Sequence, residues 1–180
     1  MPRVQNVHER TLPHSPTDVG ALLGSLASAE DRLWPAWRWP AQRLDGPLAV
    51  GARGGHGPIR YTVVEYEPGA RVVYEFTAPR GLIGTHGIEI VERDSRRTVM
   101  RHTLVGRTAG SMRLAWPLVW RPMHDALIDD ALDTAAASLA GEPIDERRLT
   151  RRVLVLRALA RRLLAAQSLT AQRPLAGDRR

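Results

Sequence analysis

The sequence predicts an α+β domain in which a curved antiparallel sheet packs against one long helix. Four strand-like segments follow one another without helices between them, and each has β-branched or aromatic residues near a period of two. These segments are residues 59–67, 71–77, 82–92 and 98–107. A helical pattern precedes them at 15–26, and a longer one follows at 111–140 and ends at Gly141. This order favours a helix laid across one face of the sheet.

The chain begins with a predicted strand at 4–12, and the helix after it has a clear N-terminal signal. Ser15 has the side chain of an N-cap, Pro16 suits the first helical position, and Asp18 lies near the positive end of the helix dipole. The segment 30–47, which holds three Trp and three Pro, predicts a short helical turn and irregular chain.

Two weaker predictions lie just ahead of the four strands. Residues 47–53 predict a further strand, and the glycine-rich segment 54–57 predicts a mobile loop at the mouth of a cavity. Because no strand–loop–helix unit surrounds these glycines, they do not predict a phosphate-binding loop.

The positive charge is concentrated in the last part of the chain. All 26 basic residues are Arg, and the formal net charge is +7. Residues 1–141 carry a net charge of +1, and residues 142–180 carry +6. We therefore expect a nearly neutral domain over 1–141, an Arg-rich tail over 142–180, and no specific nucleic-acid partner.

The composition excludes several classes of protein. Hydrophobic residues make up 43%, enough for a core, and the absence of Cys excludes disulfides, thiol nucleophiles and Cys-type zinc sites. No apolar run approaches the ~18 residues of a membrane span, and the first residues lack the apolar stretch of a signal peptide. These observations predict a cytoplasmic protein.

The period of two also assigns side chains to the two faces of the sheet. The inward sets are Val72, Tyr74 and Phe76 on one strand, His86, Ile88 and Ile90 on the next, and Met100, His102 and Leu104 on the last. A hairpin that turns around Ser95 places Ile88 opposite His102. His86 is then a diagonal neighbour of His102, roughly 7 Å away.

The final helix has an acidic side and an opposite side of apolar and small residues. The acidic side holds Asp125, Asp129, Asp130 and Asp133. The opposite side holds His124, Leu127, Ile128, Ala131, Ala135 and Ser138. His124 is therefore predicted to face the sheet, and the small residues predict space for a cavity beneath the helix.

Four short motifs accompany this order of elements. They are LPHSPTDV at 12–19, Trp37, EYEPGARV at 65–72 and RLAWPLV at 113–119. With them, residues 4–141 resemble the helix-grip fold of the START-like, or SRPBCC, superfamily, and most of all its polyketide cyclase/dehydrase and lipid-transport group. The resemblance implies a sheet wrapped around the last helix and an internal cavity whose lining varies.

The three inward histidines are the candidate catalytic residues. Burial lowers the pKa of a histidine, and a neutral imidazole can take a proton from an activated carbon or hydroxyl, as an aldol cyclisation or dehydration requires. His86, His102 and His124 could act in this way. The alternative is that each is a hydrogen-bonded residue of the cavity wall. Nothing in their spacing predicts a metal site, and no cofactor is expected.

The candidate ligand-binding residues come from the inner side of the sheet, the last helix and the segments that lead into them. They are Trp37, Tyr74, Phe76, Ile88, Met100, Trp116, Trp120, Arg121, Leu127 and Ala131. Trp37 could cover a planar or lipid-like ligand, and Arg121 could anchor a ligand carboxylate. The alternatives are core packing for Trp37 and an exposed surface position for Arg121.

The tail predicts a helix over about 147–167, in which a stripe of Leu, Val and Ala is flanked by Arg. Such a helix can lie on an anionic membrane surface or bind an acidic protein partner. It can also pack on the domain or against a second copy of the chain in a homodimer. Both interpretations remain open from the sequence.

Three functional hypotheses follow from these features. The first is binding, transport or sequestration of a hydrophobic small molecule, lipid-like or polyketide-like, in an internal cavity. The second is a polyketide cyclase/dehydrase-type enzyme that uses the inward histidines as acid and base. The third is a membrane-peripheral protein that is targeted by its basic tail.

Overall fold

The computed structural model describes residues 1–94, 96–144 and 147–171, with side chains of the last helix as far as Arg162. The chain forms two compact units, Met1–Arg147 and Arg148–Arg180. The first unit holds a sheet and a long helix, and the second holds one helix, α4 (Arg151–Ala171).

Within the described residues, one antiparallel sheet of seven strands forms the framework of the first unit. Its strands are β1 (Arg3–Leu12), β2 (Arg43–Leu44), β3 (Arg53–His56), β4 (Ile59–Glu67), β5 (Arg71–Ala78), β6 (Leu82–Asp94) and β7 (Arg97–Thr108). The order across the sheet is β1-β7-β6-β5-β4-β3-β2, so the first strand pairs with the last. This arrangement confirms the predicted α+β class.

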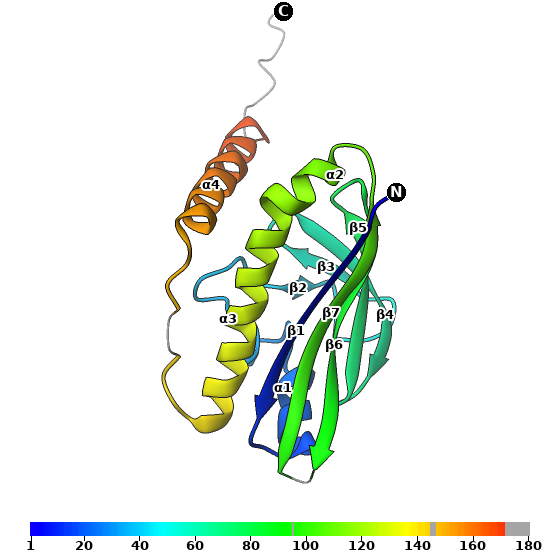
Figure 1. Cartoon of the computed structure of the whole chain (residues 1–180), viewed down its shortest axis with the longest axis vertical. Coiled ribbons are helices and arrows are strands. Elements are labelled where there is room, and N and C mark those ends of the chain that lie inside the picture. Colours follow the sequence, from blue (N-terminus) through cyan, green and yellow to red (C-terminus); the bar gives the residue numbers. More distant parts are fainter. Residues whose placement is uncertain (95, 145–146, 172–180) are drawn as a thin grey trace, which may run out of the picture. The chain divides into compact units, whose positions relative to one another are not determined.

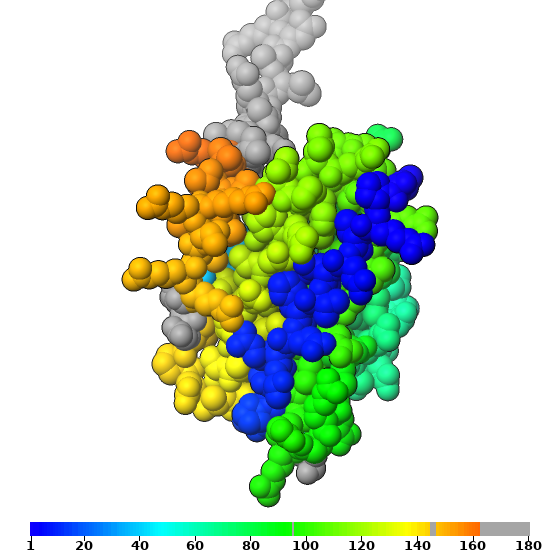
Figure 2. All heavy atoms as spheres, in the orientation of Figure 1, coloured from blue at the N-terminus to red at the C-terminus, as the bar shows by residue number. Residues whose placement is uncertain are grey.

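The helices of the first unit are α1 (Pro16–Gly24), α2 (Met112–Ala115), the π-helical segment η1 (Trp116–Trp120) and α3 (Arg121–Ala140). Figure 1 shows α3 running along β1, with β2 and β3, at the other end of the strand order, passing behind it. In Figure 2, β1 (blue) and α3 (yellow-green) lie side by side, and Asn6 of β1 donates a hydrogen bond to Asp125 of α3 at 2.7 Å. The long helix is thus attached at the β1 edge of the sheet.

The predicted start of the first helix and the predicted end of the long helix are confirmed, while the first helix ends at Gly24, two residues earlier than predicted. The side-chain oxygen of Ser15 accepts a hydrogen bond from the Asp18 N–H at 3.2 Å, and Pro16 is the first residue of α1. At Pro117, which has no N–H to donate, the long helix widens into η1, where the Arg121 N–H donates to the Trp116 carbonyl. Gly141, with a φ of 68°, ends α3.

The predictions for residues 47–57 are wrong. Residues 47–52 form bends, turns and irregular chain instead of a strand, and residues 54–56 are part of β3 instead of a loop, with Gly57 in the turn that follows. A Cβ atom at Gly54 would lie 2.0 Å from the Arg43 carbonyl oxygen, and one at Gly55 would lie 2.0 Å from the Ile59 carbonyl oxygen. The glycines therefore permit neighbouring strands to approach closely. Because glycine is common both in loops and in closely packed strands, composition alone does not distinguish the two.

The predicted inward face of the sheet is confirmed. Ile88 pairs with His102, as expected for a hairpin around Ser95, although residue 95 itself lies outside the described residues. Members of the inward sets with at most 2% of their surface exposed are Val72, Tyr74, Met100 and Leu104. The side of α3 predicted to be apolar is also buried, through Leu127, Ile128, Ala131 and Ala135.

Helix α4 of the second unit has the predicted mixture of Arg and apolar residues. Leu154, Val155 and Leu159 are exposed, and so are Arg151 and Arg161. In the part of the chain that the structure describes, no helix combines the length and the apolar character needed to cross a bilayer.

The approach of α1 to the β4–β5 turn gives a first testable prediction. A Cβ atom at Gly20 would lie 2.4 Å from the Gly69 carbonyl oxygen. Ala is a better helix former than Gly by about 1 kcal/mol, but overlap with a backbone atom outweighs this gain. We expect Gly20→Ala to lower the free energy of unfolding by about 1–3 kcal/mol, measured by urea denaturation.

Gly24→Ala is the matched control, because nothing lies within 4 Å of a Cβ atom at Gly24, at the end of the same helix. We expect this variant to be unchanged or more stable by up to about 1 kcal/mol. Equal stability of the two variants would contradict the proposed role of the close approach.

Candidate functional site

The three histidines predicted from the sequence lie in one row. His86 comes from β6, His102 from β7 and His124 from α3. The ring centroids of His86 and His102 are 5.7 Å apart, and those of His102 and His124 are 5.0 Å apart. The row therefore crosses from the inner face of the sheet to the long helix.

Aromatic side chains extend the histidine row across β4 and β5. His86 stacks on Phe76 and Tyr74, with centroid distances of 4.6 and 5.1 Å. The Tyr61 ring meets His86 edge-on at 5.2 Å and has His56 at 6.1 Å. The inner face thus presents flat rings with polar atoms at their edges.

Most polar atoms of the row are buried without a hydrogen-bond partner. Among the described residues these atoms are Tyr61 Oη, His86 Nε2 and both ring nitrogens of His102 and of His124. Tyr61 is 1% exposed and His102 is 3% exposed. Buried polar groups nearly always have a partner, and a missing one costs about 1–3 kcal/mol. The row therefore requires partners from a bound molecule or from water.

Burial keeps the inner histidines neutral. Removal from water lowers the pKa of His86 and His102 well below 6.5, lowers that of His56 to about 3, and also lowers that of His124. Burial raises the pKa of the Tyr61 hydroxyl, which stays protonated. Each neutral imidazole has one donor and one acceptor, so the row offers both kinds of hydrogen bond without a net charge.

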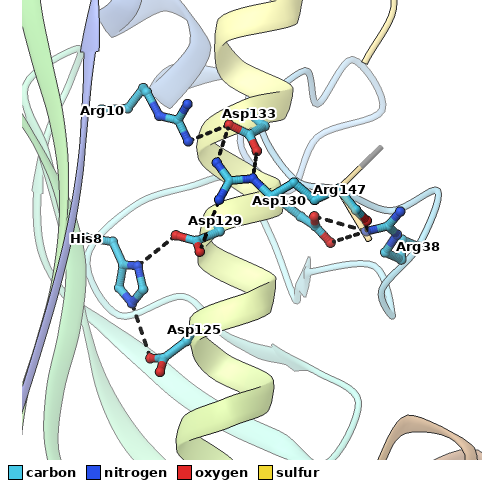
Figure 3. Close-up of polar contacts among 8 residues, drawn as sticks. All are labelled: His8, Arg10, Arg38, Asp125, Asp129, Asp130, Asp133 and Arg147. Atoms are coloured by element: carbon cyan, nitrogen blue, oxygen red, sulfur yellow. Dashed lines mark hydrogen bonds and ion pairs between the residues drawn. The ribbon is translucent and has the colours of Figure 1, made fainter. Parts of the chain in front are cut away.

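His8 lies next to the row and is held between two carboxylates of α3 (Figure 3). Its Nδ1 is 2.9 Å from Asp129 Oδ1, and its Nε2 is 3.3 Å from Asp125 Oδ1. Hydrogen bonds to Asp125 and Asp129 raise the pKa of His8 to about 9, against the effect of burial. The His8 and His124 ring centroids are 6.1 Å apart. The charged His8, with its two carboxylates, therefore lies at one end of the neutral histidine row.

The acidic side of α3 contacts other elements of the first unit. Asp130 is 3% exposed and accepts a hydrogen bond from Trp39 Nε1 at 2.7 Å. Asp133 pairs with Arg10 of β1 and with Arg147, as Figure 3 shows. These contacts hold α3 against β1 and tie the segment after Gly141 to the same helix.

Eight of the ten predicted ligand-binding residues are buried or half-buried. They are Tyr74, Phe76, Ile88, Met100, Trp116, Trp120, Leu127 and Ala131. Trp37, in the turns after α1, is 41% exposed, and the Arg38 guanidinium lies 4.3 Å from its ring centroid. The Arg121 side chain is 57% exposed and pairs with Asp125 at 3.8 Å, one helical turn away. Trp37 and Arg121 are therefore surface side chains and not members of the row.

Four residues of this region escape prediction from the sequence. Asn6 and His8 share the parity of the buried Leu12, so the period of two in the first strand contained the signal for them. Tyr61 has the parity of its buried strand neighbours, while His56 lies in the segment predicted as a loop. Their proximity to the row depends on tertiary contacts that span most of the chain.

The sequence matches no protein-family model and no curated protein. The structure, however, resembles solved structures. A Thermobifida fusca protein solved by NMR has a TM-score of 0.61 at 19% identity, over 80% of this chain and 98% of that chain. Norcoclaurine synthase from Thalictrum flavum, in complex with dopamine and hydroxybenzaldehyde, has a TM-score of 0.58 at 14% identity, over 79% and 90%. CalU16 from Micromonospora echinospora has a TM-score of 0.53 at 13% identity, over 90% and 86%.

These likenesses show the fold of the chain. The sheet that curves around the long helix α3 is a helix-grip fold, as the resemblance in sequence implied. At such low identities the arrangement of the backbone is shared, while the chemistry of the inner face has to be argued from this chain's own residues.

The neutral histidines predict a loss of stability in acid. Because the pKa of His56 and of His86 is below 6.5 in the folded protein, the unfolded chain takes up their protons first as the pH falls through 6.5. Each such histidine then lowers the free energy of unfolding by about 1.4 kcal/mol per pH unit. His8 does not offset this loss, because its stabilisation is already complete below 6.5 and is lost only as the pH rises through about 9.

Urea denaturation between about pH 6.5 and pH 5 measures this slope. We expect the His56→Gln/His86→Gln variant to have a slope that is smaller by about 2 kcal/mol per pH unit, because an unfolded histidine is only half protonated at pH 6.5. Gly24→Ala, which changes no titratable group, is the control and should keep the wild-type slope. An unchanged slope in the double variant would show that the two buried histidines are not held neutral.

Proposed function

We propose that the chain binds a hydrophobic small molecule that carries hydroxyl or carbonyl groups, on the inner face of its sheet. The observation that carries this proposal is the row of buried polar atoms without partners, on Tyr61, His86, His102 and His124. A purely apolar ligand would leave these atoms unpaired. A ligand with oxygen atoms along a flat skeleton would pair with them and exclude water.

The surroundings of the row favour a polyketide-like aromatic ligand over a simple lipid chain. Phe76, Tyr74 and Tyr61 supply ring faces and edges next to His86. Aromatic side chains stack on planar ligands, and such contacts add to the gain from removing apolar surface from water. The complex of norcoclaurine synthase with dopamine and hydroxybenzaldehyde supports the idea that this fold can hold small oxygenated aromatic molecules.

Titration with 1,8-dihydroxyanthraquinone, followed by tryptophan fluorescence, tests the binding proposal. We expect His102→Leu to weaken binding at least about tenfold, equivalent to about 1.4 kcal/mol, because it removes two polar atoms from the centre of the row. His14→Gln should bind as the wild type does. Equally tight binding of anthracene by the wild type, or an unchanged affinity of His102→Leu, would contradict a polar ligand. Mass spectrometry of co-purified molecules then identifies the natural ligand.

A second candidate function is catalysis of a cyclisation or dehydration by the same histidines. His86, His102 and His124 are neutral neighbours, so one can accept a proton while another donates one. In an aldol cyclisation, one imidazole removes a proton from the carbon beside a carbonyl group. That carbon attacks a second carbonyl carbon of the same molecule, and the alkoxide formed takes up the proton held by the imidazolium, either directly or through a neighbouring imidazole that is neutral again afterwards. In the dehydration, a neutral imidazole removes a second proton from the same carbon and gives it to the departing hydroxyl, which leaves as water.

Turnover of a linear poly-β-keto thioester separates catalyst from carrier. The enzyme hypothesis expects the His86→Gln, His102→Gln and His124→Gln variants to lose turnover while at least one retains binding of the substrate. Absence of turnover in the wild type, with binding intact, would favour the carrier.

A peripheral membrane role for α4 is a third proposal, and it rests on a separate surface. Leu154, Val155 and Leu159 are exposed on a helix that also exposes Arg151 and Arg161. Apolar side chains beside arginines suit the boundary between acyl chains and anionic headgroups. This function would place a cytoplasmic protein at the surface of a membrane.

Sedimentation with vesicles tests this role. We expect the full chain to sediment with phosphatidylglycerol vesicles and to remain in solution with phosphatidylcholine vesicles. The Leu154→Ser/Leu159→Ser variant should lose sedimentation, while Ile83→Ser, which changes an exposed apolar residue of β6, should keep it. Dimers of the wild type that become monomers in the double variant would instead indicate that α4 packs against a second copy.

A further inference from the structure

Three side chains from two elements place metal-binding atoms close together beside the histidine row. His8 comes from β1, and His124 and Asp125 are consecutive residues of α3. One nitrogen or oxygen atom of each lies within 4.8 Å of the others. His8 Nε2 is 3.3 Å from Asp125 Oδ1, and His124 Nδ1 is 3.9 Å from the same oxygen.

These distances suit a tetrahedral ion after small adjustments of the side chains. Bonds of about 2.0–2.1 Å from an ion to nitrogen and oxygen ligands separate neighbouring ligand atoms by roughly 3.3–3.5 Å. The His8–Asp125 distance already meets this value, the His124–Asp125 distance is 3.9 Å, and the ligand nitrogens of the two histidines lie within 4.8 Å of each other, so the His124 ring would move toward both other ligands. Two imidazoles and one carboxylate also form the three-ligand set of zinc sites that keep a fourth position open.

Neighbouring polar groups orient two of the three ligands. Asp129 Oδ1 lies 2.9 Å from His8 Nδ1, and Nε2 faces Asp125 (Figure 3). An ion would displace the proton of the His8 imidazolium from Nε2, and Asp129 would hold the remaining proton on Nδ1. A carboxylate on the outer nitrogen of a metal-binding histidine is a recurrent feature of such sites. Asn6 donates a hydrogen bond to Asp125 Oδ1 at 2.7 Å and holds that carboxylate in place.

An independent observation comes from His124. Both of its ring nitrogens are buried without a hydrogen-bond partner among the described residues, because its Nδ1 is 3.9 Å from Asp125, too far for a hydrogen bond. The ion pair of His8 with Asp125 and Asp129 leaves this imidazole unexplained. A metal ion would use one of its nitrogens, and the two carboxylates would balance a double positive charge.

We propose that His8 Nε2, His124 Nδ1 and Asp125 Oδ1 bind a divalent transition-metal ion of the Zn²⁺, Co²⁺ and Cu²⁺ class, with Asp129 as the positioning residue for His8. Imidazole nitrogen favours these ions over Mg²⁺ and Ca²⁺, which prefer oxygen ligands. Because His124 also belongs to the histidine row, the ion would lie beside the proposed ligand. The metal site does not depend on that ligand, since all of its protein ligands are part of the chain.

Isothermal titration of the full chain, purified without a histidine tag and treated with chelator, tests the site in the absence of any organic ligand. We expect one Zn²⁺ per chain, a higher Tm with Zn²⁺ and no comparable effect of Mg²⁺. His124→Gln and Asp125→Asn should abolish this binding, and Asp129→Asn should weaken it about 10–100-fold. His14→Gln should bind Zn²⁺ as the wild type does.

A spectrum of the wild type keeps the test informative if a variant fails to fold. The electron paramagnetic resonance spectrum of bound Cu²⁺ should show coupling to two imidazole nitrogens. Absence of Zn²⁺ binding by the wild type, binding that persists in a folded His124→Gln variant, or a Cu²⁺ spectrum without imidazole nitrogen would overturn the proposal. Each of these outcomes leaves the proposal of a small-molecule ligand untouched.

Discussion

The pairing of β7 with its two neighbours, β6 and β1, is the constraint on which the inner face depends. Side chains alternate along a strand, so a slip of one residue in either pairing would turn a whole set of side chains outward. In the observed register His102 stands opposite His8 of β1, and His86 stands on the same face of β6. Helix α3 contributes a residue to each of two groups. His124 packs against His102 in the row, and Asp125 forms an ion pair with His8.

Two histidines that face each other across neighbouring strands differ in charge, because His8 is protonated and His102 is neutral. The carboxylates of α3 raise the pKa of His8 to about 9, whereas burial lowers the pKa of His102 well below 6.5. The His124 ring lies between them, with centroid distances of 6.1 and 5.0 Å. The boundary between charged and neutral histidine therefore falls between His8 and His124, because only the His8 ring lies within hydrogen-bond distance of both carboxylates.

Much of the fold could be predicted because its signals are local. Alternation in the strands assigned His86 and His102 to the inner face, and the helical period assigned His124 to the side that meets the sheet. The His8–Asp125 contact joins residues 117 positions apart, and no local pattern reports such a pairing. For Arg121, the sequence position at the start of the long helix did not predict whether the side chain is buried. In the structure it is 57% exposed and pairs with Asp125.

The lack of protein partners for the row has a consequence for selectivity. In a histidine with a fixed hydrogen bond, one tautomer is chosen before any ligand arrives. Both nitrogens of His102 and of His124 are without such a bond among the described residues, and their ring contacts are edge and face contacts that fix no proton. The His102 ring, which takes no part in the proposed metal site, is therefore free to present its donor and acceptor in either orientation. For the ligand proposed above, ring shape, more than the position of each oxygen atom, would then decide which molecules are accepted.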